Sequence, residues 1–204
     1  MLYNKIYYFF TEDKVKYTKD PSEFIETTVS SECHFEGKVL RVFRDEIALP
    51  NGKTSFREYN KHKGAVCVIP VTDKGEVVCV RQYRYAVGKI LLEIPAGKLD
   101  YVGEDHESAA RRELREETGA TAEKLTYLGE YLGSPAILDE TIYMYLAEGL
   151  TFGETDFDED EFIEIVKLPL SGLVDMVMRG EIPDGKTQIA ALRAWKMIGD
   201  GIGK

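Results

Sequence analysis

Residues 104–120 read EDHESAARRELREETGA, and this stretch carries the clearest structural signal in the chain. Ala109, Ala110 and Leu114 form a narrow apolar stripe at helical spacing. Acidic residues open the stretch, where they suit the positive end of a helix dipole, and Gly119 stands where a left-handed residue commonly ends a helix. The stretch therefore predicts an amphipathic helix that ends at Gly119.

Three carboxylates of this helix, Glu113, Glu116 and Glu117, are spaced i, i+3 and i+4, so they project from one face and repel one another. Two interpretations of that face are open at this point. In the first, Arg112 and Arg115 offset the repulsion and the face is simply solvated. In the second, the three carboxylates are oxygen ligands for Mg²⁺ or Mn²⁺.

The residues before this helix are rich in strand signals. Residues 1–60 look like short strands, and KVLRVFRDEIAL at 38–49 is followed by a PNG turn at 50–52. The runs AVCVIPV and EVVCVRQY are almost continuously apolar, as strands buried on both faces tend to be. The DKG segment at 73–75 lies between them and predicts a hairpin.

After the helix, strands are expected at KLTYLGEY, TIYMYLAEGL and FIEIVKLPL, and two short helices are expected near 171–179 and 187–198. The order β-rich, helix, β-rich, helix predicts an α+β or three-layer fold instead of a βαβ array. A boundary is expected near residues 60–64, which divides the chain into an N-terminal β-rich region, 1–60, and a larger domain, 61–204.

Composition narrows the possible partners. The 204 residues carry 36 acids against 26 bases, a formal charge of −10, so no basic surplus exists to neutralise a nucleic acid. No apolar run approaches the ~18 residues of a membrane span, and MLYNKIYYFF at 1–10 reads as a strand instead of a signal peptide. Cys67 and Cys79 lie in valine-rich runs and are expected to be buried. With Cys33 they make an odd number without paired spacing, which favours a reducing cytoplasm.

The helix and the loop before it resemble the signature of the Nudix hydrolase family, G-x5-E-x7-R-E-U-x-E-E-x-G-U, in which U is bulky and apolar. The matching positions are Gly97, Glu104, Arg112, Glu113, Leu114, Glu116, Glu117 and Gly119. Two departures stand out: six residues, not five, separate Gly97 from Glu104, and the last position is the small Ala120. We expect the extra residue to form a bulge at Tyr101–Val102 that leaves the backbone near Ala96 intact.

The flanking residues resemble one branch of this family, the ADP-ribose pyrophosphatases. RQYRYAVGKILLEIPAGKLD at 81–100 is similar to that branch's approach to the signature, and Pro135 lies sixteen residues after Gly119, as the branch's proline does. The REY at 57–59 fits the same branch, whose members form intertwined homodimers. The resemblance implies a Nudix-type α/β/α sandwich with a mixed sheet, preceded by a small N-terminal antiparallel β-sheet region that serves dimerisation.

The resemblance also implies a reaction and a metal site. ADP-ribose and water would give AMP and ribose 5-phosphate, with two or three Mg²⁺ or Mn²⁺ ions per site. Glu113 and Glu117 would be direct metal ligands, Glu116 a third that also takes part in catalysis, and the carbonyl of Ala96 would complete the set. Glu104 would pair with Arg112 in a structural role.

Relatives use a glutamate from a distant loop as the base, and Glu161 is preferred here slightly over Glu159, although this acidic run would also suit a solvated loop. Arg84 would reach phosphate or ribose oxygens, and Arg57 would do so from the neighbouring subunit, with a surface ion pair as the alternative for each arginine. Glu140 would bind the terminal ribose.

Two groups of residues are left outside the predicted site. Trp195, at helical spacing with Leu192 and Ile198, is expected in the core. His34, His62 and His106 show no ligand spacing and receive no role.

Rival functions remain. A sister enzyme would hydrolyse another nucleoside diphosphate sugar, such as GDP-mannose or ADP-glucose, with the same metal centre and a different pocket. A non-catalytic regulator would bind the nucleotide as a signal, but it should have lost ligand glutamates, and all three are present. A structural interaction domain would require the whole signature to be coincidence.

Overall fold

The computed structural model describes residues 18–157 and 162–201. By its contacts the chain forms two units, residues 1–58 and 59–204. The strand expected at residues 1–10 lies outside the described ranges. None of the described helices is both long and apolar enough to cross a membrane.

The N-terminal unit is a three-stranded sheet in the order β1-β2-β3. It comprises a 3-10 turn (Pro21–Phe24), β1 (Thr27–Glu36), β2 (Arg41–Ala48) and β3 (Thr54–Asn60). Strand β1 runs antiparallel to β2. The expected turn joins β2 to β3, where Gly52 takes a φ of +80° and donates its N–H to the Leu49 carbonyl at 2.9 Å.

The second unit contains two sheets and three helices. Its strands are β4 (Ala65–Pro70), β5 (Glu76–Arg84), β6 (Lys89–Glu93), β7 (Ala96–Lys98), β8 (Ala120–Tyr131), β9 (Ile142–Phe152) and β10 (Glu164–Pro169). Its helices are α1 (His106–Thr118), α2 (Leu170–Met178) and α3 (Gly185–Gly199), with a 3-10 turn at Tyr85–Val87. One sheet has the order β7-β4-β9-β8 and the other β10-β5-β6. The first is mixed, because β4 runs parallel to β9 and antiparallel to β7.

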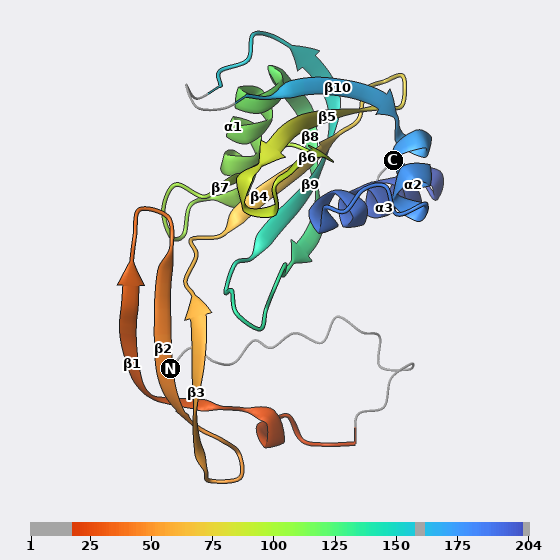
Figure 1. Cartoon of the computed structure of the whole chain (residues 1–204). Coiled ribbons are helices and arrows are strands. Elements are labelled where there is room, and N and C mark those ends of the chain that lie inside the picture. Colours follow the sequence, from red (N-terminus) through yellow and green to blue (C-terminus); the bar gives the residue numbers. More distant parts are fainter. Residues whose placement is uncertain (1–17, 158–161, 202–204) are drawn as a thin grey trace. The chain divides into compact units, whose positions relative to one another are not determined.

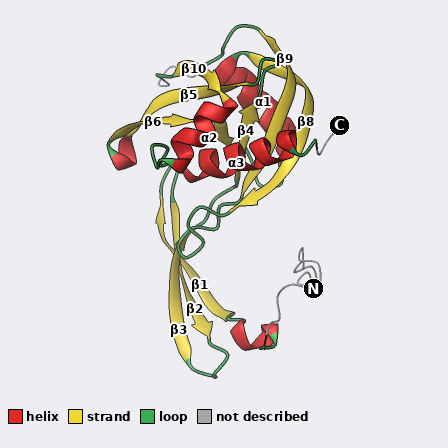
Figure 2. Cartoon of the chain, turned by 90° about the vertical axis from the view of Figure 1, so that its right-hand side faces the viewer, coloured by secondary structure: helices red, strands yellow, loops and turns green. Residues whose placement is uncertain are grey.

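The mixed sheet is the middle layer of an α/β/α sandwich, as Figures 1 and 2 show. Alternate residues of β4 point to opposite faces, as they must in a strand. Cys67 and Ile69 pack in the cluster formed with α2 and α3, whereas Val66 and Val68 pack against α1. All six residues of β4 are buried, which confirms the strand that was predicted to be buried on both faces.

The hairpin predicted around residues 73–75 is wrong. The turn itself forms, with the Gly75 N–H bonded to the Thr72 carbonyl at 2.8 Å. However, β4 and β5 enter different sheets, and only an isolated bridge between Val71 and Val77 joins their ends. The reason is competition for edges, because β7 and β9 occupy both edges of β4 while β6 and β10 occupy both edges of β5.

Helix α1 begins and ends where its sequence predicts. The Asp105 carboxylate accepts a hydrogen bond from the Ser108 N–H at 2.9 Å and caps the start. Gly119 ends the helix with a φ of +68° and donates its N–H to the Arg115 carbonyl at 2.8 Å. The predicted apolar stripe of Ala109, Ala110 and Leu114 is fully buried.

The placement of Trp195 in the core is wrong, because 48% of its surface is exposed, and Leu192 and Ile198 are exposed at 39% and 42%. Helix α3 instead buries Ala190, Ala191 and Ala194 completely. A helix carries more than one stripe at a given spacing, and here the small residues face the mixed sheet, where they allow close approach.

Candidate functional site

The candidate site is built on the face of α1 that carries the three glutamates. Glu113 and Glu117, one turn apart, are buried at 9% and 5% exposure, while Glu116 is half-buried. Burying two carboxylates on one helix is costly unless they are bonded or bind a cation. Their surroundings therefore decide what this face of the helix can do.

The short strand β7 supplies the backbone against which these carboxylates lie. The Ala96 N–H donates to Glu117 Oε2 at 3.1 Å. A Cβ atom at Gly97 would lie 2.1 Å from Glu113 Cδ, so this carboxylate occupies the space that any other residue's side chain would take. Pairing of β7 with β4 holds this backbone in place. The cluster therefore explains why position 97 carries a glycine.

Arginines bridge the outer part of the cluster. Arg112 Nη1 donates to Glu113 Oε1 at 2.7 Å and to Glu116 Oε2 at 3.2 Å, and Arg115 Nη2 lies 3.3 Å from Glu116 Oε1. Burial lowers the pKa of Arg112, but the charge of Glu113 and its hydrogen bond outweigh burial and raise it overall. The arginines thus offset the repulsion, as the first interpretation of this face expected, but Glu113 and Glu117 are buried and not solvated as that interpretation also expected.

The chemistry of this donor set fits a divalent cation. Two buried carboxylates and a half-buried third are hard oxygen donors of the kind that Mg²⁺ and Mn²⁺ prefer. Within residues 18–157 and 162–201, no three acidic, histidine or cysteine side chains are already arranged around a metal position. In this structure the guanidinium of Arg112 bridges Glu113 and Glu116.

The extra residue of the signature loop forms an exposed turn. Tyr101 and Val102 are exposed at 61% and 81%, and the Glu104 N–H closes the turn on the Tyr101 carbonyl at 3.2 Å. Glu104 Oε2 accepts from the Asp100 N–H at 2.6 Å, and its other oxygen lies 3.6 Å from Arg112 Nη2. The predicted pairing of Glu104 with Arg112 is therefore confirmed. The Ala96 group that contacts the cluster is its N–H, and the role of its carbonyl stays a prediction.

Arg84, at the end of β5, forms an ion pair with Glu93 that the sequence reasoning missed. Its Nε and Nη2 donate to the two Glu93 oxygens at 2.9 and 2.8 Å. The hydrogen bonds to Glu93 raise the pKa of Arg84, burial opposes them, and the charges of Glu93 and Glu117 raise it further. Arg84 thus belongs to the electrostatic surroundings of the α1 carboxylates. An acid inside the apolar run LLEIP was the available signal for Glu93.

Glu140 lies in the loop between β8 and β9, where it pairs with His62. Its Oε1 is 3.1 Å from His62 Nδ1, and the backbone N–H of His62 donates to Asp139 at 2.6 Å. His62 thus contacts this loop through both its ring and its backbone, a structural contact that the sequence did not indicate. The loop's approach to residues 60–64 brings together segments far apart in the sequence.

Of the remaining predicted residues, one belongs to the N-terminal unit and two lie outside the described ranges. Arg57 belongs to the N-terminal unit, where its guanidinium pairs with Glu26 on the same unit and its Nη1 donates to the Phe56 carbonyl at 2.9 Å. The two candidate bases, Glu159 and Glu161, lie outside the described residues.

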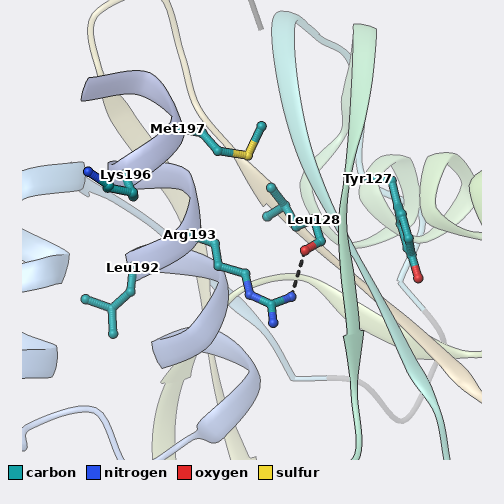
Figure 3. A pocket seen from close by; sticks show the side chains of 6 residues that line it. All are labelled: Tyr127, Leu128, Leu192, Arg193, Lys196 and Met197. Atoms are coloured by element: carbon teal, nitrogen blue, oxygen red, sulfur yellow. Dashed lines mark hydrogen bonds between the residues drawn. The ribbon is translucent and has the colours of Figure 1, made fainter. Parts of the chain in front are cut away.

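A hollow of about 350 Å³ lies elsewhere, between α3 and β8 (Figure 3). Its lining consists of Tyr127, Leu128, Leu192, Arg193, Lys196 and Met197. Arg193 Nη1 donates to the Leu128 carbonyl across it at 2.7 Å. None of the α1 carboxylates lines this hollow, so it is separate from the candidate site.

Similarity to known proteins agrees with this geometry. The chain is 44% identical over 167 residues to an ADP-ribose pyrophosphatase of Bacillus subtilis (strain 168), covering 81% of this chain and 90% of the relative. It is 43% identical over 169 residues to a methanol dehydrogenase activator of Bacillus methanolicus, covering 82% and 91%. It is 36% identical over 157 residues to an ADP-ribose pyrophosphatase of Mycobacterium tuberculosis (strain ATCC 25618 / H37Rv), covering 76% of each.

A solved structure described as an ADP compounds hydrolase shares the fold, with a TM-score of 0.73, 23% identity, and coverage of 86% of this chain and 96% of the other. Residues 61–188 match the family model of the NUDIX domain. That match includes the whole signature helix and the β7 backbone against which its carboxylates lie. The chain therefore belongs to the Nudix family.

Proposed function

We propose that this protein hydrolyses the pyrophosphate of ADP-ribose to AMP and ribose 5-phosphate. The observation that carries the proposal is the pair of buried carboxylates, Glu113 and Glu117, held against the backbone of Gly97 and Ala96. The relative named ADP-ribose pyrophosphatase at 44% identity over 167 residues supports this substrate. Relatives named GDP-mannose pyrophosphatase are 36% identical over 138 residues, which supports the alternative more weakly.

We assign the binding of metal ions and of substrate to separate residues of the chain. Glu113 and Glu117 would hold the cations, with Glu116 as a third ligand and the Ala96 carbonyl completing the set. Two or three bound Mg²⁺ or Mn²⁺ ions would neutralise pyrophosphate oxygens and lower the pKa of an attacking water. Arg84 would donate to a phosphate or ribose oxygen, and Glu140, whose carboxylate lies 3.1 Å from His62 Nδ1, would accept from the terminal ribose.

A base is still needed to take the proton of the attacking water, and we place it in the segment between β9 and β10. Glu161 is preferred over Glu159. Conversion of the true base to Gln should lower kcat by orders of magnitude with little change in KM. A fall of less than about tenfold for both variants would exclude this segment.

A substrate panel tests the proposal directly. ADP-ribose, ADP-glucose and GDP-mannose are each incubated with and without Mg²⁺, and the phosphate released from the products by a coupled phosphatase is measured. We expect ADP-ribose to give the highest kcat/KM and turnover to require Mg²⁺. A preference for GDP-mannose or ADP-glucose would reassign the substrate, and tight binding without turnover would make the protein a regulator.

Variants of the helix link that activity to the site. Glu113→Gln and Glu117→Gln should each lower kcat by about 100-fold or more, because each removes an anionic ligand. The matched control is Glu107→Gln on the same helix, since Glu107 is exposed and pairs with Arg111 at 2.9 Å. If the two site variants keep wild-type activity in folded protein, the assignment of this cluster is wrong.

We further propose that the protein is a homodimer and that residues 1–60 form part of the interface. The N-terminal unit exposes several large apolar side chains: Phe24 in its 3-10 turn and Val29, Phe35 and Phe56 in its sheet are all at least half exposed in the single chain. Exposed apolar side chains that cluster on one surface are a feature of protein interfaces. Size-exclusion chromatography with light scattering tests the dimer.

A cytoplasmic location would suit the three free cysteines, since thiols stay reduced there.

A further inference from the structure

Glu93, the last residue of β6, is the centre of a buried ionic network. Only 1% of its surface is exposed, so its carboxylate depends on its partners for stabilisation. It accepts two hydrogen bonds from Arg84, and Lys186 Nζ donates to it from the other side at 2.5 Å. Both oxygens of Glu93 are thus held by cations.

Lys186 ties this network to the start of α3. It is itself buried at 8% exposure, and its Nζ also donates to Asp184 Oδ1 at 2.9 Å. Asp184 caps the helix, accepting from the Thr187 N–H at 3.0 Å, and Thr187 Oγ1 accepts from the Ile94 N–H at 2.9 Å. Glu93 is therefore fixed by strand and helix together, and its carboxylate has a defined orientation.

This arrangement leaves one edge of Arg84 for a ligand. Its Nε and Nη2 are engaged by Glu93, and no hydrogen bond within the described ranges uses Nη1. The Arg84 side chain is 41% exposed, in contrast to the 1% of Glu93. A guanidinium held along one edge presents its remaining N–H groups in a fixed plane, which suits binding of a phosphate oxygen.

We infer that Glu93, supported by Lys186, is a positioning residue that orients Arg84 toward an anionic oxygen of the diphosphate substrate. The inference rests on the proposed function, because it needs a diphosphate in the site. An unheld arginine would lose rotamer freedom on binding, and Glu93 imposes that order before the substrate arrives. If the network were purely structural, it would join β6 to α3, and the effect of replacing Glu93 on kcat/KM would not depend on Arg84.

A double-mutant cycle separates these two roles. Steady-state kcat and KM for ADP-ribose are measured for wild type, Arg84→Ala, Glu93→Gln and the double variant. We expect Glu93→Gln to lower kcat/KM by about 10-fold or more in the wild-type background, and by less than about twofold once Arg84 is gone. Equal effects of Glu93→Gln in both backgrounds, or an Arg84→Ala variant with wild-type kcat/KM, would overturn the inference.

Chemical rescue of activity is a second test, because a change in protein stability alone would not produce it. Millimolar guanidinium ion, well below denaturing concentrations, should restore part of the activity of Arg84→Ala, because Glu93 can hold the free cation where the side chain was. It should restore none in Arg84→Ala/Glu93→Gln. Equal rescue of both variants would contradict a role for Glu93 in positioning.

Two further variants keep the test interpretable. Lys186→Gln removes the cation that fixes Glu93 from the α3 side, so it replaces Glu93→Gln in the cycle if that variant does not fold. Its loss of kcat/KM should be smaller, because Arg84 and Glu93 are both kept, and should likewise disappear once Arg84 is gone. Glu164→Gln is the control, because Glu164 pairs at 2.8 Å with Arg81, an arginine on the same strand as Arg84. This variant should leave kcat/KM unchanged. A wild-type protein without turnover of any panel substrate would refute the proposed function itself, a result distinct from additivity in the cycle.

Discussion

Gly97 is the residue at which the β7 backbone and the α1 carboxylates come closest. A Cβ there would overlap the Glu113 carboxylate, at 2.1–2.2 Å from its three outer atoms. Because these atoms are the far end of a flexible side chain, Gly97→Ala should displace the carboxylate and leave the fold intact. We expect kcat/KM to fall about 10- to 100-fold, with the thermal midpoint Tm within a few degrees of wild type.

The control for this change is Gly199→Ala, since a Cβ at Gly199 meets no atom within 4 Å. It should leave activity unchanged and Tm unchanged or slightly raised, because alanine is the better helix former. A Gly97→Ala enzyme with full activity would show that the position of Glu113 against β7 is unimportant.

Glu93 should also contribute to the pH dependence of the free energy of unfolding. Burial raises its pKa, but the hydrogen bonds and charges of Arg84 and Lys186 outweigh burial and lower it overall. The unfolded chain, with a Glu pKa of about 4.3, then binds more protons than the folded one. The contribution of Glu93 is therefore complete above roughly pH 4.3 and is lost as pH falls through its lowered folded-state pKa.

Urea unfolding at about pH 6 and about pH 3.5 measures this contribution. Wild type should lose more free energy of unfolding between the two pH values than Glu93→Gln, which has no carboxyl group to titrate. Equal losses in the two proteins would show that Glu93 is not held as an anion.

At the scale of elements, the junction of α1 with β8 depends on Gly119. Its φ of +68° strains any L-residue, and a Cβ there would lie 2.4 Å from the Gly153 carbonyl oxygen, which is backbone and cannot swing aside. Gly119→Ala should lower the free energy of unfolding by about 3 kcal/mol or more, since left-handed strain alone costs about 1–2 kcal/mol.

Gly180, just after α2, provides the matched comparison. It has a φ of +76°, and a Cβ added there would meet no atom within 4 Å, so Gly180→Ala carries the strain without the collision. Its cost should be about 1–2 kcal/mol. Urea titration of both variants checks this, and equal costs would mean that the contact with Gly153 relaxes freely.

At the scale of the whole molecule, the reactivity of the three cysteines tests the packing of the core. Cys67 in β4 and Cys79 in β5 are fully buried, and burial raises the pKa of each thiol to about 12. Cys33 on β1 is exposed. Because the thiolate is the reactive form, Ellman's reagent at about pH 8 should modify one thiol per native chain promptly and all three after denaturation. Prompt reaction of two or more native thiols would contradict the packing of the sandwich.

The helix α1 and its carboxylates could be predicted from the sequence because the signals are local. The opening acidic residues, the apolar stripe and the ending glycine lie within one short stretch, and helical periodicity alone aligns Glu113, Glu116 and Glu117. The burial of β4 on both faces was predictable for the same reason. The spacing by itself left both a solvated face and a metal site open, and the resemblance to the Nudix signature favoured the metal site.

Strand pairing and side-chain partners were decided only by the tertiary structure. The turn at residues 73–75 forms as predicted, yet β4 pairs with β7 and β9 instead of β5, because the outcome depends on competing strands far along the chain. Trp195 is exposed because alanines of α3 fit closer to the sheet. Lys186 meets Glu93 across 93 positions, a separation that no local pattern reports. Local periodicity thus determined the elements, and long-range competition for edges and buried charges determined how they meet.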